Sequence, residues 1–157
     1  MTTEHTKKGM INQELYSKIH SLLPILCIDI LIHIDGAFLA VLRTVEPMKH
    51  MWSLPGGRLF RDESIPQAIR RICSEEVGLD ILEAEFLGYE NTVFDADPFG
   101  HGEGTHTVNL VFTAKAIGKK VRLDPTHSTY RWVPCKDIER LDCHAYVYRT
   151  VNKWKQK

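Results

Sequence analysis

The chain has 157 residues, 43% of them hydrophobic, with 20 Lys and Arg side chains balanced by 20 Asp and Glu side chains. This length corresponds to one domain of ordinary size that can bury a proper core. A net charge of zero gives no electrostatic reason to expect a nucleic acid or an anionic membrane surface as partner.

Nothing in the hydropathy pattern points to a membrane or to secretion. The longest apolar run, residues 22–34, is interrupted by polar residues and is too short to span a bilayer. The first ten residues are charged, and no apolar signal segment follows them. We therefore expect a cytoplasmic protein that binds a small molecule.

The four cysteines are far apart in the sequence and include no C-x-x-C pair: Cys27, Cys73, Cys135 and Cys143. Such spacing is not typical of a zinc site or of a disulfide framework. We expect reduced thiols, as is usual inside cells.

The N-terminal part is divided into a tail and the start of the main domain. Residues 1–10 are expected to be mobile, and residues 12–21 fit a short helix, so that 1–20 precede a domain at 21–157. Residues 24–34 and 37–44 are apolar, strand-like runs. Asp35 and Gly36 between them favour a β-hairpin.

Residues 55–79 predict a turn, a loop, a helix and a stop. Gly56 and Gly57 allow a tight turn and a close approach to a ligand. After the loop 58–63, Ser64 is suited to cap a helix whose apolar residues recur at helical spacing, and Gly78 is suited to end it. Glu75 and Glu76 lie near the C-terminal end of this helix, where the dipole disfavours anions. A hard cation bound through oxygen ligands would explain their presence.

The second half of the chain is rich in predicted strands, at 85–94, 105–116 and 129–133. In 105–116, Val108, Leu110 and Phe112 alternate with Thr107 and Asn109, which gives one apolar face and one face polar enough to line a site. The acidic, glycine-rich residues 95–104 fit a mobile loop or lid. Residues from 142 onwards fit a closing amphipathic helix. The order indicates an α/β (α+β) fold with a mixed sheet.

The stretch 57–79 resembles the Nudix box, G-x5-E-x7-R-E-U-x-E-E-x-G-U, in which U is a bulky aliphatic residue. The matching residues are Gly57, Glu63, Arg71, Glu75, Glu76, Gly78 and Leu79, with Cys73 a weaker match at the first U. The Glu expected after the arginine is Ile72. The resemblance implies the Nudix fold, a mixed β-sheet in an α/β/α sandwich. It also implies a Mg²⁺ ion, with Mn²⁺ as an alternative, and Glu63 as organiser of the loop.

One Nudix branch, the GDP-mannose mannosyl hydrolases, also lacks a Glu after the box arginine. The segments GAFLAVLR, WSLPGGR and PTHSTYRWV, followed by His144-Ala145, are similar to that branch in order and spacing. This similarity implies substrate contacts by Arg43, Arg58, Arg71 and, after a one-residue shift, Asp29. It implies metal ligation by Glu76 and the Gly56 carbonyl, to which Glu75 of the box is added. Thr126 replaces a Gln that ligates metal in the branch.

The chemistry expected from this resemblance is attack of water on the anomeric carbon of a nucleoside-diphosphate sugar, with GDP-mannose as the leading candidate. The leaving diphosphate needs positive charge, which one Mg²⁺ and the guanidinium groups of Arg43 and Arg58 would supply. His127 is the candidate general base. His101 and His106, which flank the 95–104 loop, are alternatives, and Trp52 is a candidate for stacking on the base.

Two other functions remain open from the sequence. The first is a Nudix diphosphatase that cleaves ADP-ribose or a nucleoside triphosphate between phosphates. The second is a nucleotide-binding sensor that lost catalysis with the carboxylate at position 72. Individual residues also have plain structural explanations, because Arg71 and Glu75 fit an i, i+4 surface pair and His127 a solvated loop histidine. Dimerisation is common among proteins that this chain resembles, so the resemblance also allows a homodimer.

Overall fold

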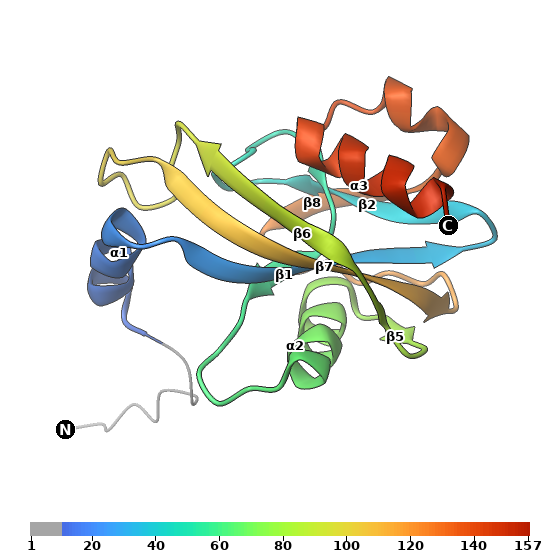
Figure 1. The fold of residues 1–157 in the computed structure, drawn as a ribbon, viewed down its shortest axis with the longest axis horizontal. Coiled ribbons are helices and arrows are strands. Elements are labelled where there is room, and N and C mark those ends of the chain that lie inside the picture. Colours follow the sequence, from blue (N-terminus) through green and yellow to red (C-terminus); the bar gives the residue numbers. More distant parts are fainter. Residues whose placement is uncertain (1–10) are drawn as a thin grey trace.

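The computed structural model describes residues 11–157 and has a central sheet between helices (Figure 1). The expected mobile tail at 1–10 lies outside the described residues. The helices are α1 (Gln13–Leu22), α2 (Ile65–Ile72), which continues as the π-helical turn η1 (Cys73–Val77), the 3-10 helix η2 (Cys135–Arg140) and α3 (Ala145–Lys155). The strands are β1 (Ile25–Ile34), β2 (Ala37–Arg43), β3 (Trp52–Ser53), β4 (Gly56–Arg58), β5 (Asp80–Ile81), β6 (Glu85–Phe94), β7 (Thr105–Ile117) and β8 (His127–Pro134).

The sheet is mixed, as the sequence predicts. Strands follow the order β3-β2-β1-β7-β5, while β4 pairs with β1, β6 with β7, and β8 with β2. β1 and β7 run parallel over nine residue pairs, and the other pairings are antiparallel. Residues of β7 that alternate in the sequence therefore face opposite sides of the sheet.

Two apolar clusters hold the helices against the two faces. Ile28 and Ile30 of β1 pack with Ile69 and Ile72 of α2 on one face. On the other, a second cluster joins the sheet to α3, and its fully buried members include Leu31, Phe38, Val147 and Val151. Among the described residues, no helix is long and apolar enough to cross a membrane.

The predicted hairpin between β1 and β2 is confirmed. His33 pairs with Phe38 and Ile34 with Ala37, so the turn consists of Asp35 and Gly36, whose φ angles are 52° and 76°. Positive φ at both positions is the signature of a tight type I′ turn, which suits Asp-Gly.

The helix of the box begins and ends where the sequence predicts, but its last turn is wider than a regular α-helix. Ser64 and Gln67 form a reciprocal capping box, and Gly78 ends the helix with φ of 64°. From Cys73 to Val77 the turn is π-helical, with the Gly78 N–H bonded to the Cys73 carbonyl. Such turns are frequent at functional sites, and this one carries Glu75 and Glu76.

Candidate functional site

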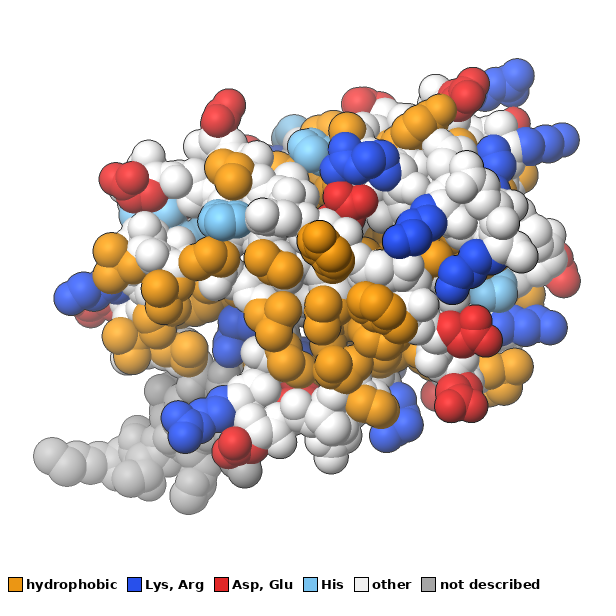
Figure 2. Space-filling model, in the orientation of Figure 1, with side chains coloured by type: hydrophobic (Ala, Val, Ile, Leu, Met, Phe, Trp, Pro, Cys, Tyr) orange, Lys and Arg blue, Asp and Glu red, His pale blue; other side chains and the backbone are white. Residues whose placement is uncertain are grey.

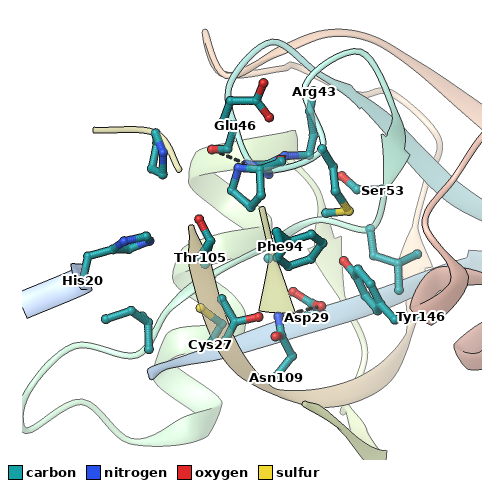
Figure 3. A pocket seen from close by; sticks show the side chains of 18 of the residues that line it. His20, Cys27, Asp29, Arg43, Glu46, Ser53, Phe94, Thr105, Asn109 and Tyr146 are labelled. Carbon is teal, nitrogen blue, oxygen red and sulfur yellow. Dashed lines mark hydrogen bonds between the residues drawn. The ribbon is translucent and has the colours of Figure 1, made fainter. Parts of the chain in front are cut away.

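A cavity opens between α1, β1, β7 and the loop that joins β2 to β3 (Figure 3). Asp29 and Asn109 lie at its floor together with Tyr146 of α3. Thr107 and Asn109 belong to the polar face predicted for 105–116, and this face does line a cavity. The pattern of alternation thus places β7 correctly.

The floor is a buried polar network. Asp29 is 4% exposed, and its Oδ2 accepts a hydrogen bond of 2.9 Å from Asn109 Nδ2. The Tyr146 hydroxyl also donates to this carboxylate, and Tyr146 is itself 4% exposed. Burial raises the pKa of Asp29 to about 7, although both hydrogen bonds favour the ionised form. The network holds one carboxylate facing the cavity in a fixed orientation.

Glu76 lies beside this floor, in the π-helical turn η1 that follows α2. Its Oε2 accepts from the Gly56 N–H at 3.1 Å, and its Oε1 is 3.3 Å from where a Cβ on Gly57 would stand. A Cβ on Gly56 would overlap the Asp29 carboxylate. Gly56 is therefore required at this close approach, whereas a side chain at Gly57 would need Glu76 to move by a few tenths of an ångström.

The negatively charged carboxylates around Glu76 would favour binding of a hard cation. Desolvation, together with the negative charges of Asp124 and Asp29, raises the pKa of Glu76 to about 8. A divalent cation would remove this penalty and favours oxygen ligands. No group of three or more His, Cys, Asp or Glu side chains within residues 11–157 is arranged to hold a metal ion by itself. Backbone oxygens and the phosphates of a ligand would have to complete the coordination.

Position 72, which is a Glu in the usual Nudix box, is an Ile in this chain, so the site has one carboxylate fewer. It is fully buried in the core cluster under the sheet, and its Cγ1 is 3.6 Å from a Cβ placed on Gly57. A Glu at this position would project toward the same place as Glu76. The chain has an apolar core residue where the usual box has a further Glu.

Arg71 and Glu63 form a bidentate ion pair that holds the loop before α2. Arg71 donates from Nε and Nη2 to the two Glu63 oxygens at 2.7 and 3.1 Å, and from Nη2 to the Arg58 carbonyl at 2.9 Å. Its guanidinium also lies 3.7 Å from the centre of the Phe60 ring. Hydrogen bonds from Arg71 hold the pKa of Glu63 below its usual range.

Arg58 and Arg43 lie nearer the cavity than Arg71 does. The Arg58 guanidinium is 5.0 Å from the ring of Tyr16 and 4.6 Å from that of Phe60. Arg43 lines the cavity and donates from Nε to the Pro47 carbonyl at 2.7 Å, which holds the β2–β3 loop. Its positive charge opposes protonation of Asp29 and Glu76.

His127 lies at the start of β8, opposite Arg43 in the ladder. Its Nδ1 is 2.8 Å from Asp124 Oδ1, and the residue is 6% exposed. Nε2 is buried and has no hydrogen-bond partner among the described residues. Burial lowers the pKa of His127, so the neutral ring donates through Nδ1 and keeps a lone pair on Nε2. The ring is next to the cavity residue Arg43 but does not line the cavity itself.

The remaining candidates are spread over the molecule. Glu75 has a side chain that is 55% exposed and lies 3.9 Å from Arg71. His106 bonds to Asn91, and Trp52 stacks on Arg131 instead of lining the cavity. Thr126 bonds to Asp124 through its hydroxyl. The other alternative base, His101, is 2.7 Å from His20 of α1.

Several residues of the cavity were not anticipated from the sequence. Tyr16, His20 and Phe99 form an edge-to-face aromatic group at its mouth, with ring centres 5.1 to 6.1 Å apart. Tyr146 closes the floor. These residues come from α1, the β6–β7 loop and α3, and local sequence patterns cannot show that the three segments meet.

Comparison with known proteins agrees with this geometry. The sequence model of the NUDIX domain matches residues 26–154. The chain belongs to the Nudix family. Its β-sheet, box helix and glycine turn are those of a Nudix hydrolase, and members of this family generally use a divalent metal ion.

Individual relatives are distant. This Nudix hydrolase is 27% identical to the low-salt glycan biosynthesis protein Agl8 of Haloferax volcanii over 129 residues, 82% of this chain and 81% of that protein. It is 25% identical to an ADP-ribose pyrophosphatase of Methanocaldococcus jannaschii over 152 residues, 96% of this chain and 86% of that one. A bifunctional NMN adenylyltransferase/ADP-ribose pyrophosphatase of Francisella tularensis, solved with AMP and a Mn ion, has a TM-score of 0.66 and 19% identity, covering 91% of this chain and 44% of its own.

Proposed function

We propose that this Nudix hydrolase cleaves a nucleoside-diphosphate sugar, with GDP-mannose as the best single substrate, by attack of water at the sugar carbon. The observation that carries the proposal is the pairing of one desolvated carboxylate, Glu76, with a buried Ile72 where a second would stand. Attack at phosphorus in Nudix enzymes depends on several carboxylates with metal, whereas departure of an intact diphosphate needs mainly charge neutralisation.

The diphosphate would bind beside Glu76. The Glu76 carboxylate and the Gly56 carbonyl would hold a Mg²⁺ or Mn²⁺ ion, with exposed Glu75 as an outer ligand. When bound, the ion would neutralise charge on the diphosphate. Arg43 and Arg58 would add guanidinium groups to the same oxygens, and Arg43 already lines the cavity. Arg71 is bound to Glu63 and the Arg58 carbonyl, so its proposed part in substrate binding is to position the Arg58 segment.

The sugar and the nucleobase of the substrate would occupy the two ends of the cavity. Asp29, held by Asn109 and Tyr146, is an acceptor suited to a sugar hydroxyl. The aromatic mouth of Tyr16, His20 and Phe99 offers flat apolar surfaces to a nucleobase.

His127 is the proposed general base. Its bond to Asp124 fixes the tautomer that leaves Nε2 able to accept a proton, as a base requires. Because Nε2 is buried in this structure, substrate would have to open access to it. His127→Gln should lower kcat by about 100-fold or more without unfolding the protein. Near-normal turnover in that variant excludes the role.

One experiment distinguishes the candidate reactions. The protein is incubated with GDP-mannose and, separately, with ADP-ribose in isotopically labelled water with Mg²⁺, and the products are analysed for label. Label in the free sugar supports attack at carbon. Label in phosphate supports the second candidate, a diphosphatase, which the 25% identity to the ADP-ribose pyrophosphatase over most of both chains favours. Binding without any product would identify a sensor and contradict both.

A further inference from the structure

Helix α1 contacts two sides of the cavity mouth, and it lies before residues 26–154, the part of the chain that the NUDIX domain model matches. Tyr16 and His20 are four positions apart, so they point to the same side of the helix, and both line the cavity. We propose that Tyr16 is a positioning residue, which holds the Arg58 guanidinium in place for the diphosphate of the substrate. The inference rests on the proposed function, in which Arg58 contacts that diphosphate.

The orientation of α1 is not set by a simple division into an apolar and a polar side. Leu15 is 49% and Leu22 70% exposed, whereas His20 is 7% exposed. Figure 2 shows hydrophobic side chains in solvent over α1, at the left of the view. Tyr16 is half-buried, with its ring centre 6.1 Å from that of His20 in an edge-to-face arrangement. Contacts of these two rings therefore decide which side of the helix faces the domain.

On the box side of the mouth, Tyr16 contacts Arg58 of β4. The central carbon of the Arg58 guanidinium is 5.0 Å from the centre of the Tyr16 ring and 4.6 Å from the centre of the Phe60 ring. A cation is attracted to the face of an aromatic ring within about 6 Å. The guanidinium is therefore confined by two rings, one from α1 and one from the loop before α2.

The backbone of Arg58 is fixed independently of α1. Arg58 pairs with Cys27 in the ladder of β1 and β4, and its carbonyl accepts a hydrogen bond of 2.9 Å from Arg71 Nη2. Gly56 and Gly57, directly before it, line the cavity, so the Arg58 side chain starts at the rim. What remains to be ordered is the long side chain itself. Restricting its rotamers before the substrate arrives lowers the entropic cost of the contact with a diphosphate.

On the other side of the mouth, the β6–β7 loop supports α1. His101 Nε2 is 2.7 Å from His20 Nδ1, and the Phe99 ring centre is 5.3 Å from that of Tyr16. The loop is itself held in shape, because Asp97 Oδ1 accepts from the Phe99 N–H at 2.8 Å and from the His101 N–H at 3.2 Å. The loop therefore keeps the ring of Tyr16 in its place.

A double-mutant cycle tests whether Tyr16 acts through Arg58. Binding of GDP in the presence of Mg²⁺ is measured by calorimetry for the unmodified protein, Tyr16→Leu, Arg58→Ala and the double variant. We expect Tyr16→Leu to raise the Kd about fivefold and Arg58→Ala to raise it at least about tenfold. The double variant should bind GDP as Arg58→Ala does, because no guanidinium is left for the ring to hold.

Two further variants separate positioning from general effects on the fold. Tyr16→Phe keeps the ring that faces Arg58 and should bind GDP like the unmodified protein. Tyr148→Leu is the matched control. Tyr148 is a helical tyrosine of α3, 39% exposed, with its hydroxyl 3.3 Å from Glu139 Oε1, and it does not line the cavity. The Kd for GDP should be unchanged in this variant.

Three outcomes would overturn the inference while leaving the proposed function in place. They are a Tyr16→Leu variant that binds GDP normally, a Tyr16→Phe variant that binds as weakly as Tyr16→Leu, and an equal loss from Tyr16→Leu with and without Arg58. The last result would mean that Tyr16 contacts the nucleobase or only supports the fold. Circular dichroism on each variant excludes unfolding, and Tyr16→Met gives the same comparison if Tyr16→Leu does not fold.

Failure of the proposed function would look different. An Arg58→Ala variant that binds GDP as tightly as the unmodified protein, or an unmodified protein that does not bind GDP, would contradict the contact between Arg58 and the diphosphate. The inference would then be wrong as well, since the guanidinium that Tyr16 holds would have no ligand to meet.

Discussion

At the scale of single residues, the two adjacent carboxylates of the box are in different environments. Glu76 is desolvated beside Gly56, and Glu75 is 55% exposed next to Arg71. Glu76→Gln keeps the shape but removes the charge. It should lower kcat by about 100-fold or more, since the group that would hold the metal is lost. Glu75→Gln should have a much smaller effect, and titration of activity with Mg²⁺ measures both. Equal losses in the two variants would contradict the assignment of Glu76 as the inner group.

The floor of the cavity permits a second residue-scale prediction. Tyr146→Phe removes the hydroxyl that donates to Asp29 and leaves the ring in the core. The free energy of unfolding should fall by about 1 to 2 kcal/mol, as expected for a buried hydrogen bond to a carboxylate. Urea denaturation near neutral pH measures this. An unchanged midpoint would mean that the bond contributes nothing net to the fold.

Single residues could be proposed from the sequence where they belong to a fixed local spacing, and not where they meet through the fold. Gly57, Glu63, Arg71 and Glu76 were proposed from the box, and their functional roles stay predictions. Tyr146 could not be found, because it is 117 positions after Asp29 in the chain and only sheet and helix packing bring the two together. The buried setting of Ile72 was likewise invisible, since the pattern showed only that a carboxylate was missing.

At the scale of elements, local patterns predicted the hairpin, the box helix and the long strand β7, because each depends on turn residues, caps or alternation. They did not predict the π-helical end of the box helix, which depends on how Gly78 is held by Cys73. Nor did they predict that α1 contacts the loop between β6 and β7. That contact is made by side chains 81 positions apart.

The contact between α1 and this loop should depend on pH. His101 Nδ1 accepts from the Glu103 N–H, so His101 Nε2 must donate to His20 Nδ1, 2.7 Å away. Protonated His20 would have a hydrogen on Nδ1 and could not accept this bond. Burial and the neighbouring His101 lower the pKa of His20 from 6.5, while Asp97 raises it. The neutral ring is favoured in the folded state, so the stability of the contact is full above pH 6.5 and falls as the pH drops below it.

Hydrogen exchange at the loop amides, measured across this pH range, checks that expectation. Protection of residues 95–104 should decrease as the pH falls below 6.5. His101→Ala should abolish the pH dependence and raise KM more than it lowers kcat, because Phe99 and the cavity mouth lose their support. His106→Ala, a histidine of β7 bonded to Asn91 away from the cavity, is the control and should behave as the unmodified protein.

The loop before α2 gives a pH prediction of the opposite kind, for a carboxylate. Hydrogen bonds from Arg71 lower the pKa of Glu63 from 4.5, so the ionised form is favoured in the folded state. The resulting stability is fully present above the unfolded pKa and is lost as the pH falls through the lower folded pKa. The difference in unfolding free energy between the unmodified protein and Glu63→Gln should therefore be constant near neutrality and shrink in acid. A difference that stays constant down to pH 3 would contradict the role of the pair.

At the scale of the whole molecule, position 72 is part of the apolar core and also lies next to the proposed metal site. Ile72 is fully buried between α2 and the sheet, yet its side chain reaches the same glycine turn as Glu76. A carboxylate there would lie in apolar surroundings and beside another negative group. The chain has therefore gained packing of its box helix at the expense of a group that could hold metal.

The substitution Ile72→Glu tests both roles of position 72, in core packing and beside the metal site. Without metal, Ile72→Glu should lower the free energy of unfolding by about 2 to 5 kcal/mol, because a buried side chain is replaced by one that must be charged or protonated in the core. Millimolar Mg²⁺ should recover part of the loss in Ile72→Glu and much less in Ile72→Gln, which has the same size but no charge. Thermal denaturation with and without Mg²⁺ measures both effects. If Mg²⁺ stabilises the two variants equally, then position 72 does not face the place where metal binds. In that case, the absence of a carboxylate at position 72 has no bearing on which bond this hydrolase breaks.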